Sequence, residues 1–241
     1  MNPLCPSSAP GLWGAPLLYV CTDRACAGTR PLLKLIDEAI AGGAGMVQLR
    51  EKTLSGRGFY SLALEALALT RPRGIPLIIN DRLDIALAAG ADGVHLGQGD
   101  LPVERARALA REALGGRPFL VGASAHNRSE ALAACAAGAD YLGCGAVFPT
   151  GTKQDIAGVV GVEGLRAVCG AVRIPVLGIG GINAENAPAV MRAGAAGAAV
   201  VSAVFGAADP RAAAQALRAA LRAALNAAPV TPPDSAGQAA E

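Results

Sequence analysis

The sequence predicts a single α/β domain folded as a (β/α)8 TIM barrel. Eight short apolar runs alternate with longer, helix-periodic stretches along the 241 residues. Apolar strands that are each followed by a helix are typical of a parallel sheet covered by helices. Eight such units fit the usual barrel length of about 250 residues. An open doubly wound sheet is disfavoured, because no Gly-rich fingerprint follows the first run.

The apolar runs are the predicted strands. They are LLYVCT (17–22), MVQLRE (46–51), PLIIND (76–81), GVHLG (93–97), FLVGASA (119–125), YLGCG (141–145), PVLGIGG (175–181) and AAVVSAVF (198–205). Helical patterns such as 31–43 lie between them. The last pattern, 211–225, places Leu217, Leu221 and Leu225 on one stripe, which we expect to cover the sheet.

A short phrase recurs before the second, fourth, sixth and eighth predicted strands. Its four copies are AGGAG, AAGADG, AAGADY and RAGAAG. Each copy joins the end of a helix, a glycine and the start of a strand, as expected for the αβ turn of a repeated unit. We expect one barrel domain over residues 17–226. Residues 1–16 are expected to form a flexible lead-in and residues 227–241 a disordered, Pro- and Ala-rich tail.

The composition argues against several classes of function. The net charge is +2 and aromatic residues make up 3% of the chain, so neither nucleic acid nor an anionic membrane is expected as the main partner. The longest uncharged run, 193–208, is too short and too Gly-rich for a membrane span. The N-terminus has no signal-peptide pattern. We therefore expect a cytoplasmic protein.

The cysteines and histidines indicate no metal cluster. Six cysteines without CxxC spacing and only two histidines argue against a zinc site or a disulfide framework. We expect reduced cysteines in the core. The Ala-rich outer helices can pack on the barrel or on a second copy, so a homo-oligomer stays open.

Polar residues gather where the predicted strands end. They are Gln48, Arg50 and Lys52; Asn80 and Asp81; Gln98 and Asp100; Ser124, His126 and Asn127; Thr150, Thr152 and Lys153; Gly180, Gly181 and Asn183; and Ser202. The strand beginnings show Gly, Ala and Pro instead. Barrels of this kind carry their active sites at the carboxyl ends of the strands. This asymmetry predicts an enzyme or a ligand-binding protein.

The stretch QLREK (48–52) predicts an anion site. Alternation along a strand puts Gln48, Arg50 and Lys52 on the same side. Two cations converging on a pocket need a compensating anion, and a diphosphate would supply it. The alternative is that both cations reach solvent and pair with Glu51 or Glu38.

Asp81 and Asp100 follow neighbouring predicted strands. Mg²⁺ takes one or two carboxylates and completes its shell with water and phosphate oxygens. The pair therefore predicts a magnesium site beside the cations. The alternative is that each aspartate caps the helix that follows it.

The stretches GIGGIN and VVSAVF predict a second phosphate site. Loops after the seventh and eighth strands of such barrels often bind phosphate through backbone N–H groups. Gly180 and Gly181 permit close backbone approach, although a plain βα turn is the alternative. The loop FPTGTK adds threonines and a lysine. Two phosphate regions indicate two phosphorylated substrates or one long one.

Taken together, QLREK, IINDRLDIALAAGADGVHLGQGD, GASAHN, FPTGTK and GIGGIN resemble the thiamine phosphate synthase (thiamine-phosphate pyrophosphorylase) family. The similarity spans roughly residues 17–210. The resemblance implies a barrel transferase that uses Mg²⁺. It would join hydroxymethylpyrimidine diphosphate to a thiazole phosphate and release thiamine phosphate and pyrophosphate.

The resemblance also implies a role for each matched residue. The pyrimidine diphosphate would be held by Gln48, Arg50, Lys52, Asn80, Ser124 and Lys153, of which Lys153, Ser124 and Arg50 are the expected catalytic residues. Asp81 and Asp100 would bind Mg²⁺. The thiazole phosphate would be held by Thr150, Thr152, Gly181, Val201 and Ser202.

Two rival functions stay open at this stage. Thiazole tautomerases share the fold and use a histidine, and a barrel could also bind thiamine intermediates without catalysis. We interpret His126 as a support for Ser124 or the substrate ring, and His95 as a hydrogen-bonded core or rim residue. Residues 154–161 are hypothesised to form a mobile lid.

Overall fold

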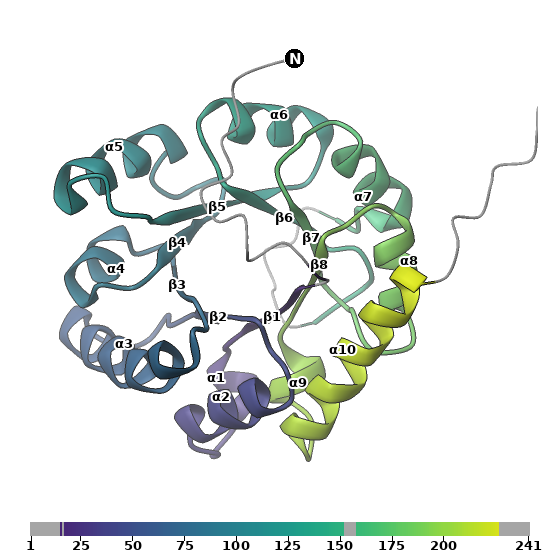
Figure 1. Cartoon of the computed structure of the whole chain (residues 1–241), viewed down its shortest axis with the longest axis horizontal. Helices are drawn as coiled ribbons and strands as arrows, with labels where there is room; N and C mark the ends of the chain where they lie inside the picture. The colour runs from purple at the N-terminus through teal and green to yellow at the C-terminus, as the bar shows by residue number, and fades with distance from the viewer. Residues whose placement is uncertain (1–14, 16, 152–157, 227–241) are drawn as a thin grey trace, which may run out of the picture.

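The computed structural model describes residues 15, 17–151 and 158–226. Eight parallel strands close into a barrel in chain order, β1 to β8, with the first strand paired to the last. The helices surround the barrel (Figure 1). The predicted (β/α)8 TIM barrel is confirmed. The expected lead-in (1–16) and tail (227–241) lie outside the described residues, apart from residue 15.

The strands are short, and the chain alternates them with helices. The strands are β1 (Leu17–Cys21), β2 (Met46–Leu49), β3 (Leu77–Asn80), β4 (Gly93–Leu96), β5 (Leu120–Ala125), β6 (Tyr141–Gly145), β7 (Val176–Ile179) and β8 (Gly197–Val200). The helices are α1 (Arg24–Ala27), α2 (Leu32–Ala41), α3 (Gly56–Thr70), the 3-10 turn η1 (Arg71–Arg73), α4 (Leu83–Ala89), α5 (Val103–Leu114), α6 (Arg128–Ala136), α7 (Gly161–Cys169), α8 (Ala187–Arg192), α9 (Ser202–Phe205) and α10 (Pro210–Asn226).

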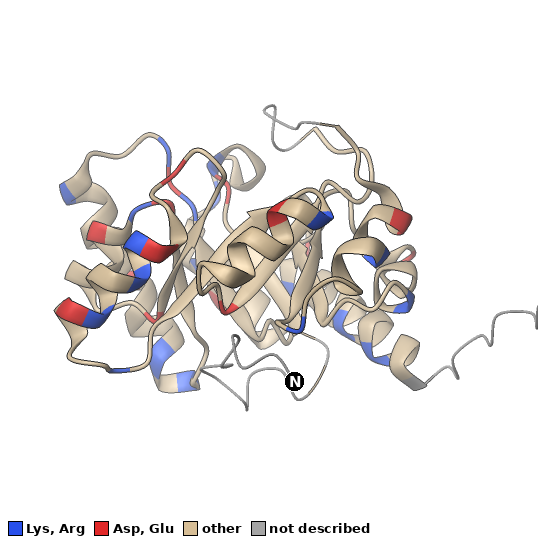
Figure 2. Ribbon diagram, turned by 90° about the horizontal axis from the view of Figure 1, so that it is seen from above, with Lys and Arg blue, Asp and Glu red and all other residues tan. Residues whose placement is uncertain are grey.

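Side chains alternate between two cores. The smaller core fills the barrel and includes Tyr19, Met46, Ile78, Tyr141 and Leu177. The larger core lies between the strands and the surrounding helices. Charged residues are mostly on the helices and loops, while the strands are mainly uncharged (Figure 2). Burial of the apolar faces on both sides of the sheet stabilises the barrel by about 25 cal/mol per Å².

The recurring phrase forms the αβ turns, as predicted. Its glycines, Gly43, Gly90, Gly138 and Gly194, all have positive φ, between 69° and 104°. The alanine after each glycine is buried. A residue with a Cβ would strain this left-handed backbone, so the glycine is what allows the chain to leave each helix and enter the next strand.

The prediction that the eighth apolar run (198–205) forms a strand is partly wrong. Only its first part is strand, since Ser202–Phe205 forms the short helix α9. The backbone leaves the sheet at Val201, with φ −119° and ψ −85°. Val204 and Phe205 are nevertheless buried, so an apolar pattern alone could not separate strand from helix here.

The stripe expected on the last helix is only partly buried. Leu217 and Leu221 are buried, as predicted, but Leu225 is 59% exposed. Each four-residue step on an α-helix rotates by about 40°, so Leu225 has turned well away from Leu217. The buried part of α10 packs beside α8 and α2 (Figure 1).

The described cysteines are not all free thiols. Burial raises the pKa of the Cys21 and Cys144 thiols to about 12, so these thiols stay protonated. Cys135 is in a disulfide, so the expectation of six reduced cysteines is wrong for this residue.

Among the residues described, no helix has the length and hydropathy needed to cross a bilayer.

We predict that Gly197→Ala destabilises the barrel where β8 meets β1. An added Cβ would lie 2.1 Å from the Leu17 carbonyl oxygen and 2.7 Å from its nitrogen. Both are backbone atoms, so the strands must separate, at a cost of about 1–3 kcal/mol in the free energy of unfolding. Urea denaturation would measure this loss. The control is Gly99→Ala, where a Cβ meets nothing within 4 Å; equal midpoints for both variants would contradict the prediction.

Candidate active site

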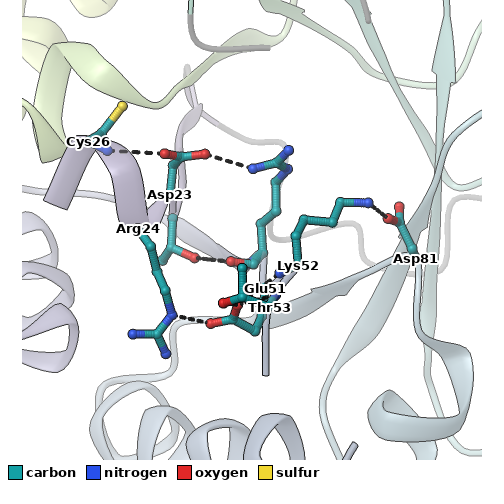
Figure 3. A network of polar contacts seen from close by, with 9 residues as sticks. Asp23, Arg24, Cys26, Glu51, Lys52, Thr53 and Asp81 are labelled. Atoms are coloured by element: carbon teal, nitrogen blue, oxygen red, sulfur yellow. Dashed lines mark hydrogen bonds and ion pairs between the residues drawn. The ribbon is translucent and has the colours of Figure 1, made fainter. Parts of the chain in front are cut away.

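The loop after β1 holds the loop after β2 at the carboxyl end of the barrel. The Arg50 N–H donates to Thr22 Oγ1 at 2.9 Å, and the Thr22 hydroxyl donates to the Arg50 carbonyl at 3.2 Å. Arg50 Nη1 lies 2.7 Å from Asp23 Oδ2. Asp23 also accepts the Cys26 N–H and so caps α1 (Figure 3). The Arg50 guanidinium is therefore held by Asp23, in the loop after β1, before any anion binds.

Glu51 holds the loop that carries Lys52. Its carboxylate accepts hydrogen bonds from the N–H groups of Lys52 and Thr53 at 2.9 and 2.8 Å, and it pairs with Arg24 (Figure 3). Burial alone would raise the pKa of Glu51, but these bonds outweigh it and lower the pKa to about 2. The side chain is 1% exposed, so this carboxylate has a structural role beneath the cations.

Lys52 reaches across to β3. Its Nζ lies 2.5 Å from Asp81 Oδ2 (Figure 3). Asp81 has φ 64°, the only positive φ outside glycine in the described part of the chain. Its N–H donates to the His95 carbonyl at 2.8 Å. Strained backbone of this kind is concentrated at functional sites, and here it turns the carboxylate toward Lys52.

Asp81 and Asp100 share one environment. Burial favours the neutral form of both carboxyls, but the bond from Lys52 lowers the pKa of Asp81, whereas burial and the adjoining Asp81 raise the pKa of Asp100. Asp100 Oδ2 also accepts the Gly97 N–H at 2.7 Å. Two carboxylates this close repel each other unless a proton or a cation lies between them.

The structure bears out only part of the alternatives for these charged residues. Lys52 does reach solvent, with 54% of its side chain exposed, whereas the Arg50 side chain is 27% exposed. The helices after the two aspartates, α4 and α5, begin without a side-chain cap. Arg50 and Lys52 pair with Asp23 and Asp81, and neither pairs with Glu51 or Glu38 among the described residues.

A chain of polar side chains crosses the barrel interior. Gln48 Nε2 donates to Tyr19 OH at 2.8 Å, and Tyr19 OH lies 3.0 Å from Tyr141 OH. His95 Nδ1 lies 3.2 Å from Tyr141 OH, and His95 Nε2 lies 3.1 Å from Ser124 Oγ. The chain thus links Gln48 to Ser124, two expected substrate residues on different strands. By alternation from Ile78, Asn80 also faces inward.

His126 has a different place from the one we expected. Its Nδ1 and its N–H both contact Glu130 Oε2 at 2.8 Å, at the start of α6. Asn127 caps the same helix by accepting the Glu130 N–H. The histidine that contacts Ser124 is His95, so the interpretation of His126 as a support for Ser124 is corrected, while its support for the substrate ring stays a prediction. The interpretation of His95 as a hydrogen-bonded residue is confirmed.

The loops after β6 and β7 pack closely together. Gly180 and Gly181 have φ of 97° and 64°. A Cβ on Gly181 would lie 2.6 Å from the Pro149 carbonyl oxygen, next to Thr150. Asn186 fixes the turn, because its Nδ2 donates to the Gly181 carbonyl at 2.9 Å.

Val201 and Ser202 stand at the start of α9. Arg30 holds the other end of this helix by donating to the carbonyls of Phe205 and Ala207. The segment between α1 and α2 therefore positions the element that carries Ser202. Thr152, Lys153 and residues 154–157, the first half of the hypothesised lid, lie outside the described residues.

Sequence reasoning missed three residues that hold the site together. Tyr19 and Tyr141 lie inside apolar runs, where only the two-residue period marks them as inward. Asp23 follows a strand, as the expected site residues do, and that position could have identified it. Across the described residues, no group of three or more His, Cys, Asp or Glu is arranged to hold a metal.

These features define a class of protein. A closed barrel with fixed cations, paired carboxylates and a tight glycine turn at one rim is typical of an enzyme barrel that acts on small molecules. A family model described as thiamine monophosphate synthase matches residues 18–204. The chain belongs to the thiamine monophosphate synthase family.

Individual relatives agree with this membership. The chain is 55% identical over 198 residues to a thiamine-phosphate synthase of Chloroflexus aurantiacus, covering 82% of this chain and 89% of the relative. It is 50% identical over 198 residues to one of Moorella thermoacetica, covering 82% and 92%. Such synthases are transferases, so the chain is an enzyme of that class.

Solved structures show the same fold. A thiamine phosphate pyrophosphorylase from Pyrococcus furiosus superposes with a TM-score of 0.77 at 42% identity, covering 87% of this chain and 96% of that one. A 3-hexulose-6-phosphate synthase superposes with a TM-score of 0.65 at 24% identity, covering 85% and 99%. The second likeness shows the fold alone.

We predict that Glu51 makes stability depend on acid pH. The pKa of Glu51 is about 2 in the folded chain against 4.5 for an unperturbed glutamate. The ionised carboxylate therefore stabilises the fold above pH 4.5, by about 3 kcal/mol, and this contribution is lost as the pH falls toward 2. Glu51→Gln should be less stable than wild type at pH 7, and the difference should shrink toward pH 3.

Denaturant titrations at several pH values would measure that difference. Glu163→Gln is the control, because the Glu163 side chain is 84% exposed and pairs with Arg166 at the surface. Its stability should follow wild type at each pH. A Glu51→Gln deficit that is constant with pH would contradict the assigned pKa.

Proposed function

We propose that the chain condenses 4-amino-2-methyl-5-hydroxymethylpyrimidine diphosphate with a thiazole phosphate, giving thiamine phosphate and pyrophosphate. The observation that carries the proposal is the charged cluster over β2, β3 and β4, formed by Arg50, Lys52, Asp81 and Asp100. The glycine turn after β7 lies across the barrel, since β7 is opposite β3 in the closed strand order. Membership in the family and the names of the relatives support the same reaction.

Each side of the site takes one substrate. The pyrimidine diphosphate contacts Gln48, Arg50, Lys52, Asn80, Ser124 and Lys153, and the thiazole phosphate contacts Thr150, Thr152, Gly181, Val201 and Ser202. Arg50 and Lys52 would bind the diphosphate, since both are already directed by carboxylates. Preformed donors of this kind cost little reorganisation when negative charge develops.

Asp81 and Asp100 fit a magnesium ion. They are two adjoining carboxylates, and the raised pKa of Asp100 reflects the negative charge beside it. Mg²⁺ needs only one or two protein carboxylates when a diphosphate and water complete its shell. When bound, it would neutralise charge on the diphosphate. Gly97, whose N–H donates to Asp100, keeps that carboxylate in place.

The protein's own residues position the reactants and hold the leaving group. The bond from the pyrimidine methylene carbon to the diphosphate oxygen breaks, and its electron pair leaves with the diphosphate. Arg50, Lys52 and Lys153 stabilise that charge. The aminopyrimidine ring delocalises the cation, and the lone pair of the thiazole nitrogen forms the new C–N bond. No proton transfer and no protein nucleophile is needed.

The rival functions are not favoured. A thiazole tautomerase has no diphosphate to bind, so the cluster of Arg50, Lys52 and the two aspartates would be without purpose. His126, the residue on which that rival depends, is held by Glu130 at the start of α6. The enzyme acts on small molecules; its cytoplasmic location, a homo-oligomeric state and the lack of nucleic-acid or membrane partners stay predictions.

Product formation tests the proposed function. We expect thiamine phosphate and pyrophosphate from the two substrates with Mg²⁺, and no product with chelator. Asp81→Asn and Asp100→Asn should each raise the Mg²⁺ concentration for half-maximal rate about tenfold or more, because each removes a charged ligand. Asn tolerates the left-handed backbone at position 81. Asp37→Asn, on the outer face of α2, is the control. Unchanged Mg²⁺ titrations would remove the aspartates from the metal site.

We predict that Lys153→Ala lowers kcat by about 10²–10³, the usual effect of removing one donor to developing charge. The KM for thiazole phosphate should change little, because Lys153 is assigned to the diphosphate. Steady-state kinetics with each substrate varied would separate the two effects. Lys34→Ala is the matched control, because Lys34 is 69% exposed on α2. Turnover within a few-fold of wild type would refute the role of Lys153.

A further inference from the structure

The hydrogen bonds inside the barrel have a fixed order of donors and acceptors from Gln48 to Ser124. Gln48 Nε2 can only donate, so Tyr19 OH accepts that bond at 2.8 Å. Among the described residues, the other polar partner of the Tyr19 hydroxyl is Tyr141 OH, at 3.0 Å. The Tyr19 proton therefore goes to Tyr141, because a buried hydroxyl proton without an acceptor costs about 1–3 kcal/mol.

The same reasoning reaches the histidine. Once the Tyr141 oxygen accepts from Tyr19, its own proton has His95 Nδ1, 3.2 Å away, as an acceptor. A neutral imidazole with an accepting Nδ1 carries its proton on Nε2. His95 Nε2 then donates to Ser124 Oγ, 3.1 Å away. Ser124 Oγ accepts this hydrogen bond from His95, so its own hydroxyl proton is left to donate to a bound substrate.

Packing keeps the rings in this arrangement. The rings of Tyr19 and Tyr141 meet edge to face, with centroids 6.0 Å apart at 78°, and His95 lies 5.5 Å from Tyr141. Gly122 makes the room for this contact. A Cβ there would lie 2.2 Å from Tyr141 Cζ and 2.6 Å from His95 Nδ1.

The phenols do not change charge at working pH. Burial raises the pKa of Tyr19 and of Tyr141 well above the ordinary value. Both hydroxyls therefore keep one proton each, and the order of donors in the chain persists across neutral pH.

We propose that Tyr19, Tyr141 and His95 are positioning residues. The two tyrosines hold His95 as the Nε2–H tautomer. The chain thereby presents the Gln48 carbonyl oxygen as an acceptor, and the Ser124 hydroxyl as a donor, to the pyrimidine diphosphate. This rests on the proposed function for the contact of Gln48 and Ser124 with that substrate. The substrate carries matching groups: an exocyclic amine that donates, and ring nitrogens and phosphate oxygens that accept. The chain thus sets the polarity of both contacts from inside the barrel.

The first test reads the tautomer without any substrate. The full-length protein is labelled with ¹⁵N-histidine, and long-range ¹H–¹⁵N correlation spectra identify the protonated nitrogen of each ring. The chain has two histidines, so His126→Gln assigns the His95 signals. We expect Nε2–H for His95 at neutral pH. An Nδ1–H tautomer, or an imidazolium, would overturn the direction of the chain whatever the substrate contacts are.

The second test removes one link and keeps the ring. In Tyr141→Phe, we expect His95 to populate both tautomers, and kcat/KM for the pyrimidine diphosphate to fall by roughly three- to tenfold, the usual effect of one neutral hydrogen bond. The KM for the thiazole phosphate should stay unchanged. Tyr60→Phe on α3, where the ring is 36% exposed, is the matched control. Wild-type kinetics for Tyr141→Phe would overturn the positioning role.

A third variant separates this proposal from the substrate assignment beneath it. Gln48→Ala should raise the KM for the pyrimidine diphosphate and leave that for the thiazole phosphate. If His95 is the Nε2–H tautomer but Gln48→Ala keeps the wild-type KM, Gln48 does not contact the substrate, and the positioning role fails while the chain itself stands.

Discussion

The two-residue alternation of strands in a closed barrel controls both the core and the site. Every second side chain points into a space that closure separates from water. Along β2, Met46 is followed inward by Gln48 and then, past the strand end, by Arg50; along β3, Ile78 is followed by Asn80. β2 therefore changes from apolar to polar to charged, and β3 from apolar to polar, toward the same rim. Parallel strand direction gathers these ends in one place, so the site is a consequence of the fold's geometry.

Charge at the rim is arranged in pairs with one carboxylate left over. Arg24 pairs with Glu51, Arg50 with Asp23 and Lys52 with Asp81. Asp100 has no ion pair among the described residues, and its pKa is raised. A diphosphate brought alone to this cluster would meet an excess carboxylate beside its cations. A divalent cation that arrives with the diphosphate offsets that charge, which is the physical reason why metal and leaving group are proposed to bind as one unit.

The sequence predicts the scaffold well because the scaffold depends on local patterns. The barrel, its eight strands and the left-handed glycines at 43, 90, 138 and 194 are confirmed, although the last strand is shorter than predicted. Where the prediction fails, the apolar pattern alone does not decide the local geometry. Ser202–Phe205 is apolar enough for a strand but turns into α9, and Leu225 belongs to the helical stripe but lies beyond the surface that α10 covers.

The two histidines show what the sequence could not predict about the site. The motif around Ser124 also contains His126, so adjacency in sequence favoured that residue as the support for the serine. A strand, however, points neighbours to opposite faces and pairs each residue with the strand beside it. His95 pairs with Gly122 across β4 and β5 and reaches Ser124, whereas His126 lies past the end of β5 and contacts Glu130 in the first turn of α6. Only strand register distinguishes the two, and register depends on how the whole barrel closes.

The glycines of β5 and β6 show what this arrangement costs. Gly122 and Gly143 stand in strand interiors, where glycine weakens a strand for lack of a side chain. A Cβ at either position would meet the Tyr141 or His95 ring, at 2.2 Å from Tyr141 Cζ and 3.2 Å from His95 Cε1. Two of the three tyrosines of the chain lie in this interior. Glycine, a poor strand former, thus stands where the rings of Tyr141 and His95 need space. This is expected if the rings serve the site as well as the core.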